Sequence, residues 1–261
     1  MAKNTQDTNA QISGNVLFYG NPQPLSKDKH GTYGVKAVDK PFAFMEKNHF
    51  VPLTAREFSA ATGSYPIIFA GSNYAPLAVM GVRQEDNLFV NDGVFNPDFY
   101  LPAFARRYPF VLAGDENNDR FIVCIDEDAD CIAKEKPTTM FFEGEEASKF
   151  TKDAFEFLQA FERDRQATDS MVNRFKELDL FEKKEMNFQG QNPDGSAAQP
   201  QKIADYFAVS AAKMAELDDK LLAEFTKNGY LAAAYAHIFS LSNWQRLVNI
   251  TLRNAQAQAA A

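Results

Sequence analysis

Four short apolar stretches in the first half of the chain have the composition of β-strands. They are rich in β-branched and aromatic residues, and Gly, Asn or Asp separates them from their surroundings. The stretches cover residues 66–70, 77–82, 110–112 and 120–125. We predict that all four are strands of one antiparallel or mixed sheet.

The spacing of apolar positions changes to the helical period after Ser148. Apolar residues then recur every three or four positions as far as Leu178, which predicts one long amphipathic helix. Arg165 and Thr168 fall on the same stripe, so two polar residues stand in the middle of the face that should be buried.

The C-terminal part of the chain predicts a hairpin and then further helices. Leu180–Phe188 and Ile203–Val209 have strand-like patterns, and the Gln-, Gly- and Pro-containing connection over 189–201 is expected to be mobile. Gly229 is suited to a left-handed helix end, and a final helix is predicted from about Tyr230 to Arg253.

Strands come first in this order and long helices last, which favours an α+β fold. We expect a sheet from the N-terminal half packed with long helices from the C-terminal half. Thr54–Glu57 matches a capping box, which predicts a short helix between two strands. The domain prediction is a disordered tail over 1–14, a single domain over 15–254 and a frayed tail over 255–261.

Charge and hydropathy narrow the classes of partner. The chain of 261 residues has a net charge of -8 and a pI near 5.0, which disfavours nucleic acid and anionic membranes as partners. Its most apolar window, Tyr230–Leu241, is too short to cross a bilayer. Residues 1–13 are polar and lack the apolar core of a secretory signal, so we expect a cytoplasmic protein.

The potential metal ligands do not form a known metal motif. Cys124 and Cys131 are seven positions apart, without CxxC or nearby histidines, and we predict free thiols in preference to a hairpin disulfide. Asp126–Asp130 begins like a calcium loop, but Cys131 stands where Gly is needed and Pro137 where the closing Glu should be. We therefore predict a solvated acidic turn and no metal site.

No cofactor or catalytic motif is present in the sequence. Neither GxGxxG nor GxxxxGK[ST] occurs, so a nucleotide cofactor has no support. His30, His49 and His237 are the only histidines, and none stands in a catalytic motif. His237 lies in an apolar helix and is predicted to be a core histidine bonded to the backbone.

Two segments are candidates for binding. In Phe161–Asp169, helical spacing brings Glu162 to Arg165 and Arg165 to Asp169. This run is either a solvated face with salt bridges or a buried polar network that forms a binding floor, and our hypothesis is that Arg165 is at least partly buried.

The second candidate segment combines aromatic rings with guanidinium groups. Tyr100, Arg106 and Arg107 would suit a carboxylate or a partner surface, although two arginines at the end of a short helix also serve as helix caps.

Several phrases of sequence together resemble the SapC family of bacterial proteins over about residues 15–254. They are YPIIF (65–69), YLPAFARRYPFVL (100–112), CIDED (124–128), FERDRQATDSMVNRFKELDLF (161–181) and SLSNWQRLV (240–248). The resemblance implies an association with a bacterial surface layer, and it brings no catalytic residues with it.

The functions that remain differ in class. A non-enzymatic binding or assembly protein, with the implied surface-layer association, fits the absence of a catalytic signature. The alternatives are a small-molecule or peptide-binding accessory protein, whose pocket the two candidate segments would line, and an enzyme with a site assembled from scattered residues. A protein or peptide partner is compatible with the first two, and the sequence leaves the oligomeric state open.

Overall fold

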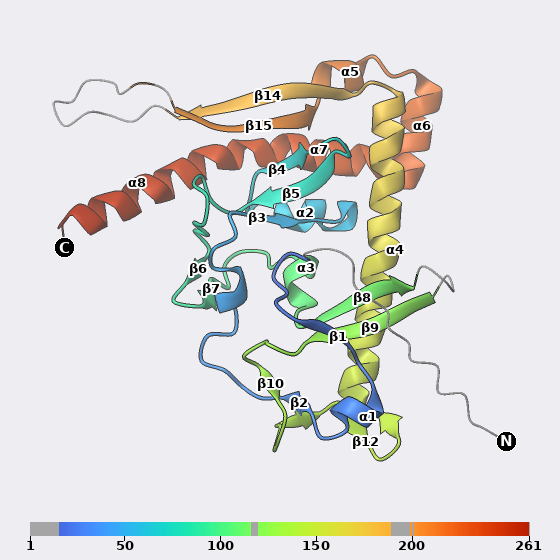
Figure 1. Cartoon of the computed structure of the whole chain (residues 1–261). Coiled ribbons are helices and arrows are strands. Elements are labelled where there is room, and N and C mark those ends of the chain that lie inside the picture. Colours follow the sequence, from blue (N-terminus) through green and yellow to red (C-terminus); the bar gives the residue numbers. More distant parts are fainter. Residues whose placement is uncertain (1–15, 116–119, 189–198, 200, 261) are drawn as a thin grey trace. The chain divides into compact units, whose positions relative to one another are not determined.

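The structure, a computed structural model, describes residues 16–115, 120–188, 199 and 201–260 (Figure 1). The tail 1–14 and most of the connection over 189–201 lie outside the described residues. The described residues fall into two compact units: unit 1 lies within residues 1–44 and 107–160, and unit 2 lies within residues 45–106 and 161–261. The single domain over 15–254 stays a prediction.

Unit 1 is built from small antiparallel sheets and the first part of a long helix. Its main sheet has the order β1-β9-β8, a second has the order β10-β2-β11, and β12 and β13 form a hairpin. The elements are β1 (Pro22–Pro24), α1 (Lys27–His30), β2 (Gly34–Val35), β8 (Phe110–Asp115), β9 (Arg120–Asp126), β10 (Ile132–Ala133), β11 (Thr139–Met140), β12 (Phe142–Glu143) and β13 (Glu146–Ala147).

The core of unit 1 joins the main sheet to the helix. Phe110 of β8 and Ile125 of β9 are buried together with Phe141 and with Leu158 of the helix, and Phe150 packs against them. Each of these residues belongs to an apolar pattern of its own element, so the core forms where those patterns meet.

Unit 2 contains a five-stranded antiparallel sheet in the order β14-β15-β4-β5-β3. A small hairpin of β6 and β7 lies in the same unit. The elements are η1 (Ala43–Met45, at the boundary between the units), β3 (Phe50–Pro52), η2 (Ala55–Glu57), α2 (Phe58–Ala61), β4 (Ile67–Ala70), β5 (Ala75–Val79), β6 (Val90–Asn91), β7 (Val94–Phe95), α3 (Ala103–Arg106), β14 (Phe181–Phe188), β15 (Gln201–Val209), α5 (Ala211–Ala215), α6 (Asp219–Asn228), α7 (Tyr230–Ser240), η3 (Leu241–Asn243) and α8 (Trp244–Ala260).

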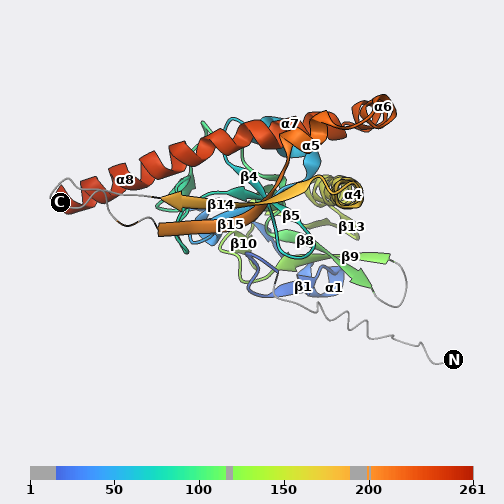
Figure 2. The same ribbon diagram turned by 90° about the horizontal axis from the view of Figure 1, so that it is seen from above.

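Helices α7 and α8 run along the five-stranded sheet of unit 2 (Figure 2). Helix α7 packs against β4 and β15, and the Trp244 ring at the start of α8 lies 5.8 Å from the Tyr206 ring of β15. Trp244 is buried. The predicted α+β fold is therefore confirmed.

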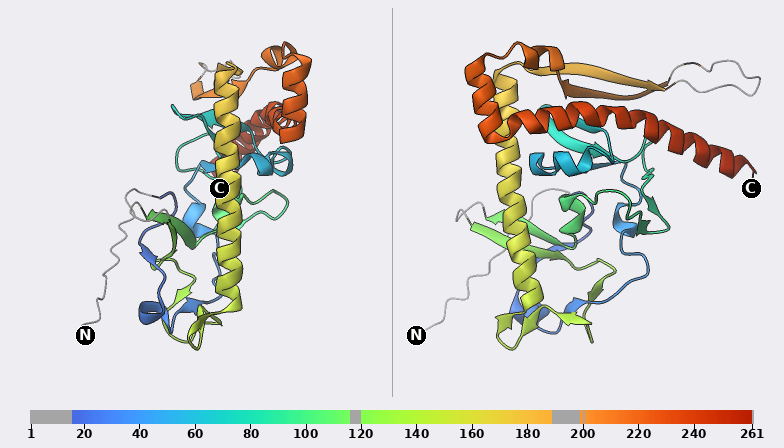
Figure 3. Two further views of the ribbon diagram at one scale, coloured as in Figure 1. Left: turned by 90° about the vertical axis from the view of Figure 1, so that its right-hand side faces the viewer. Right: turned by 180° about the vertical axis from the view of Figure 1, so that it is seen from behind.

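The predicted long helix is α4 (Lys149–Glu177), a single continuous helix in all views (Figure 3). Its residues as far as Ala160 belong to unit 1 and the rest to unit 2. The predicted hairpin is also confirmed, as β14 and β15. No helix in the described part of the chain is both long and apolar enough to cross a membrane.

The prediction of one sheet was wrong. β4 and β5 belong to the sheet of unit 2, whereas β8 and β9 pair in the sheet of unit 1. The hairpin β14-β15, from the C-terminal half, joins the sheet of unit 2 through β4. An apolar run shows that a strand is buried but does not say which edge it pairs with, and this explains the error.

The final helix also differs from the prediction. A 3-10 turn, η3, separates α7 from α8, because two polar side chains bind other elements there. Ser240 Oγ accepts a hydrogen bond from Ile67 N at 2.9 Å, and Asn243 Nδ2 donates to Thr62 O at 2.6 Å. Helix α8 continues beyond Arg253 to Ala260, since alanine and glutamine favour helix.

Candidate functional site

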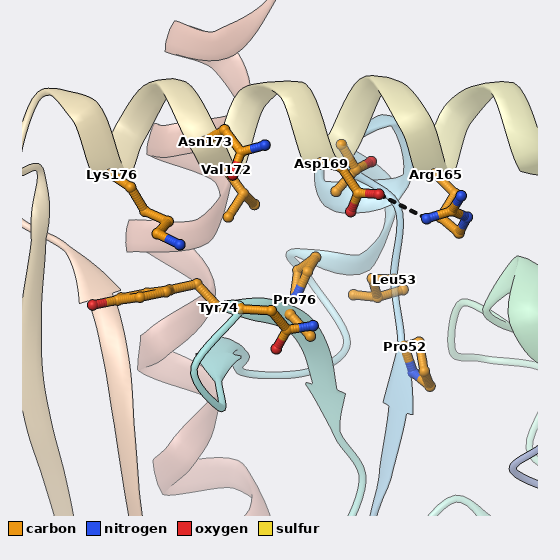
Figure 4. A pocket seen from close by; sticks show the side chains of 12 residues that line it. Pro52, Leu53, Tyr74, Pro76, Arg165, Asp169, Val172, Asn173 and Lys176 are labelled. Carbon is orange, nitrogen blue, oxygen red and sulfur yellow. Dashed lines mark hydrogen bonds and ion pairs between the residues drawn. The ribbon is translucent and has the colours of Figure 1, made fainter. Parts of the chain in front are cut away.

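A groove of about 450 Å³ in unit 2 lies between α4 and the segments around β3 and the β4-β5 turn (Figure 4). It is lined by Pro52, Leu53, Asn73, Tyr74, Ala75, Pro76, Arg165, Thr168, Asp169, Val172, Asn173 and Lys176. Two of the predicted site residues, Arg165 and Asp169, are among them.

Helix α4 supplies one wall through its repeat of three and four residues. Arg165, Asp169, Val172 and Lys176 recur at that spacing and therefore share a face. Thr168 is buried, donates to Asp164 O at 2.6 Å and accepts from Ala55 N at 2.8 Å. Because its hydroxyl has both of these partners, Thr168 can stand on the buried apolar stripe without an unpaired polar group.

The opposite wall includes the turn between β4 and β5, which positions the aromatic ring of Tyr74 in the groove. Gly71 and Tyr74 both have left-handed backbone conformations, with φ of 71° and 55°. The Tyr74 ring is stacked on Phe181 of β14 at 4.6 Å between centroids and is tilted against Phe207 of β15 at 4.4 Å. These contacts offset the backbone strain of a non-glycine residue at positive φ.

The charges along the groove are arranged as a dipole. Arg165 binds Glu162 through Nε and Nη2 at 2.8 and 2.6 Å, and Asp169 through Nη1 at 2.7 Å. The hydrogen bonds that Arg165 donates to Glu162 raise the pKa of Arg165, and the three side chains sum to one negative charge. At the other end the Lys176 ammonium lies 5.2 Å from the centre of the Tyr74 ring.

Arg165 is only partly buried, and its ion pairs do not form the buried polar network that our hypothesis favoured. Its side chain is 49 % exposed, so the run around it is a solvated face with the predicted salt bridges. The guanidinium carries a charge whose desolvation would cost several kcal/mol, and the long side chain extends past the apolar stripe into water.

Tyr100 and Arg106 lie in a different cluster of unit 2, around the buried carboxylate of Glu57. Glu57 accepts from Thr54 N at 2.8 Å, from Ala103 N at 2.6 Å and from the Tyr100 hydroxyl at 3.0 Å. Arg106 donates to that hydroxyl at 3.2 Å, while burial and then Glu57 raise the pKa of Tyr100. The predicted capping box is present, and its carboxylate also holds the start of α3.

Arg107 belongs to unit 1, where its guanidinium lies 5.7 Å from the centre of the Tyr19 ring. Tyr19 donates to Phe110 O at 2.6 Å, and burial raises its pKa. The two adjacent arginines thus serve different clusters. A ligand-binding role for Tyr100, Arg106, Arg107 and Glu162 stays a prediction.

The predicted solvated turn over Asp126–Asp130 is right for Asp128 and Asp130, which are exposed, but wrong for Asp126. The Asp126 side chain is buried and accepts from Gly20 N at 3.0 Å, Asn21 N at 2.8 Å and the Tyr108 hydroxyl at 3.1 Å. Desolvation and the charge of Asp126 raise the pKa of Tyr108. The carboxylate therefore ties β1 to β9, which its acidic sequence context did not reveal.

His237 is the predicted core histidine. It is fully buried, with Nδ1 2.8 Å from Ile67 O and Nε2 accepting from Val209 N at 3.0 Å. Burial lowers its pKa to about 4. His30 is also buried, and its Nε2 lies 2.8 Å from Glu127 Oε1. In the described residues both histidines thus bind structural partners.

The cysteines and carboxylates do not converge on a metal position within the described ranges. Cys124 and Cys131 are free thiols, as predicted, and burial raises the pKa of Cys124 to about 11. A thiol with a raised pKa is a poor nucleophile near neutral pH.

The sequence patterns did not single out several residues of the groove, above all Lys176 and Tyr74. Lys176 follows Arg165 by eleven positions, or about three helical turns, so the helical period alone could have placed both on one face. No local pattern could have placed Tyr74 opposite them, because it belongs to a turn distant in sequence.

Comparison with known proteins identifies one family. The model of the family described as SapC matches residues 25–247. No curated protein and no solved structure matches at a significant level.

Proposed function

This chain belongs to the SapC family, whose model covers most of its length, and from that premise we propose that it is a non-enzymatic binding protein whose groove holds a small molecule or peptide with a carboxylate. The family match supplies no reaction. Within the described residues, the groove is lined by charged, amide and apolar side chains, without a thiol or a histidine.

Lys176 is the observation that carries the proposal. In the part of the chain that the structure describes, no carboxylate pairs with its ammonium, which lies over the Tyr74 ring. Both Asn73 and Asn173 expose side-chain amides in the same groove, and Val172 and Leu53 give it an apolar floor. A cation, two amides and an apolar floor together suit a ligand with a carboxylate and an apolar body.

The test is a thermal-shift screen of amino acids, short peptides and small carboxylic acids, followed by calorimetry on each hit. A ligand of the folded state raises the melting temperature. Replacing Ala75, which lines the groove, by Trp should fill the groove and abolish binding. The control Ser59→Trp adds the same ring at an exposed position of α2 outside the groove and should bind normally.

Two results would contradict the proposal. Binding that survives in Ala75→Trp would place the ligand elsewhere on the molecule. A screen without any hit at millimolar concentration would remove the groove as a binding site.

A second candidate function, assembly from copies of this chain, is favoured by exposed aromatic side chains on α7. Phe239 is 63 % exposed, and its ring lies 6.0 Å from that of the partly exposed Tyr235. A surface layer, which the family resemblance implies, would require contacts between copies. Light scattering should then show oligomers that Phe239→Ser reduces to monomer, and a monomer at high concentration would rule the assembly out.

A further inference from the structure

We infer that the ligand of the groove is a short peptide of about three residues with free termini, its amino group bound by Asp169 and its carboxylate by Lys176. This inference rests on the proposed function and narrows its ligand class. Three features of the groove carry it: the sign of the charge at each end, the length between the ends, and the chemistry of the middle.

The two ends of the groove carry opposite charge. Glu162, Arg165 and Asp169 sum to one negative charge, and Arg165 Nη1 engages only the Oδ2 atom of Asp169. The Oδ1 atom of Asp169 can therefore accept from a ligand ammonium. Lys176 supplies the positive end, and its ammonium can donate to the carboxylate of a ligand. A zwitterionic ligand matches both ends, whereas an anion alone would be repelled by the first.

The length of the groove selects the size of the ligand. Asp169 and Lys176 are seven positions apart on α4, which corresponds to about 10.5 Å along the helix axis. An extended peptide spans about 3.3 to 3.6 Å per residue, so about three residues bridge the two ends. A single amino acid reaches one end only, and a longer peptide must leave one terminus outside.

The middle of the groove suits a peptide backbone. Asn173 lies on α4 between Asp169 and Lys176 (Figure 4). Asn73 also lines the groove and directly precedes Tyr74 of the opposite wall. Each side-chain amide offers both a donor and an acceptor, as a peptide bond requires. Val172 of α4, with Leu53 and Pro76 opposite, lies between the charged ends and can contact small apolar side chains.

Calorimetry with trialanine and its capped forms tests the inference on the unmodified protein. Trialanine should bind more tightly than N-acetyl-trialanine and than trialanine amide, by about five- to tenfold in each case, because each cap removes one charge-assisted hydrogen bond. Dialanine and pentaalanine should both bind more weakly than trialanine. Raising the salt concentration should weaken trialanine most, since its charged ends lie near solvent.

Two variants assign the ends of the peptide. Asp169→Asn should weaken trialanine about fivefold and leave N-acetyl-trialanine unchanged, because the capped peptide has no ammonium to lose. Lys176→Gln should weaken trialanine by a similar factor and leave trialanine amide unchanged. Both residues are exposed, so the folded state should tolerate the changes, and equal melting temperatures would verify this.

The outcomes separate this inference from the proposed function. Capped peptides that bind as well as trialanine, and lose binding in Ala75→Trp, would overturn terminal recognition and leave the groove as a binding site. If neither free nor capped peptides bind and another carboxylic acid does, the tripeptide ligand is wrong and the proposed function still holds. If no compound of the screen binds, both the tripeptide ligand and the proposed function are wrong.

Discussion

At the scale of single residues, the buried His237 makes the stability of the fold depend on pH. Its ring is held between Ile67 O and Val209 N, and burial lowers its pKa from 6.5 to about 4. In the unfolded chain the ring takes a proton near pH 6.5, whereas in the folded chain it stays neutral. Stability is therefore fully present above pH 6.5 and is lost as the pH falls toward 4.

This prediction can be tested with urea unfolding between pH 7.5 and 4.5. The loss attributable to His237 should be about 2 to 3 kcal/mol at pH 4.5. The variant His237→Gln removes the titrating group while other groups still titrate, so its stability should fall less over the same range. Equal slopes for the two proteins would contradict the assignment.

Substitution of Glu57 should lower the free energy of unfolding far more than substitution of Arg165. Glu57→Gln replaces a buried acceptor of several N–H and O–H groups by an amide that can accept through one atom only, and we expect a loss of about 2 to 3 kcal/mol in the free energy of unfolding. Arg165→Ala removes two ion pairs of a half-exposed guanidinium, and the loss should stay below about 1 kcal/mol. Denaturant unfolding of both variants gives the comparison, and a larger loss in Arg165→Ala would reverse our assignment of these residues.

At the scale of elements, the hairpin β14-β15 depends on one aromatic anchor. Phe181 is buried against Phe69, Tyr74 and Phe175, with ring centroids 4.9, 4.6 and 6.0 Å away. Phe181→Ala should cost about 3 to 5 kcal/mol in the free energy of unfolding, since it leaves a cavity among these rings.

The matched control for the hairpin is Phe239→Ala. Its ring is largely exposed, so the loss should be within about 0.5 kcal/mol. Chemical denaturation measures both variants. If Phe181→Ala lost no more free energy of unfolding than Phe239→Ala, Phe181 would not be the residue that anchors the hairpin.

At the scale of the whole molecule, we predict that divalent metals do not stabilise the fold. Backbone N–H groups and the Tyr108 hydroxyl already engage both oxygen atoms of Asp126, and the described residues hold no cluster of metal ligands. About 1 mM calcium or 0.1 mM zinc should leave the melting temperature unchanged, because a metal raises it only by binding the folded state. A rise of several degrees that disappears in Asp128→Ala would contradict this prediction.

The sequence by itself determined the local elements of this protein. The three- and four-residue apolar period specifies α4, the alternating segments specify the hairpin, and Thr54 with Glu57 specifies a helix start. The spacing on α4 also places Glu162, Arg165 and Asp169 within reach of one another. These features are readable because each depends on neighbours a few positions away.

Only the tertiary structure decided which elements meet. Burial of Asp126, exposure of Arg165 and the partition of the strands between two sheets depend on residues far apart in the chain. The groove itself requires Tyr74 and Lys176, about a hundred positions apart, to lie beside each other. A hydrophobic pattern indicates which face of an element is buried, but not which other element covers that face. A binding site is made of contacts between residues far apart in the chain, so the pattern alone does not reveal it.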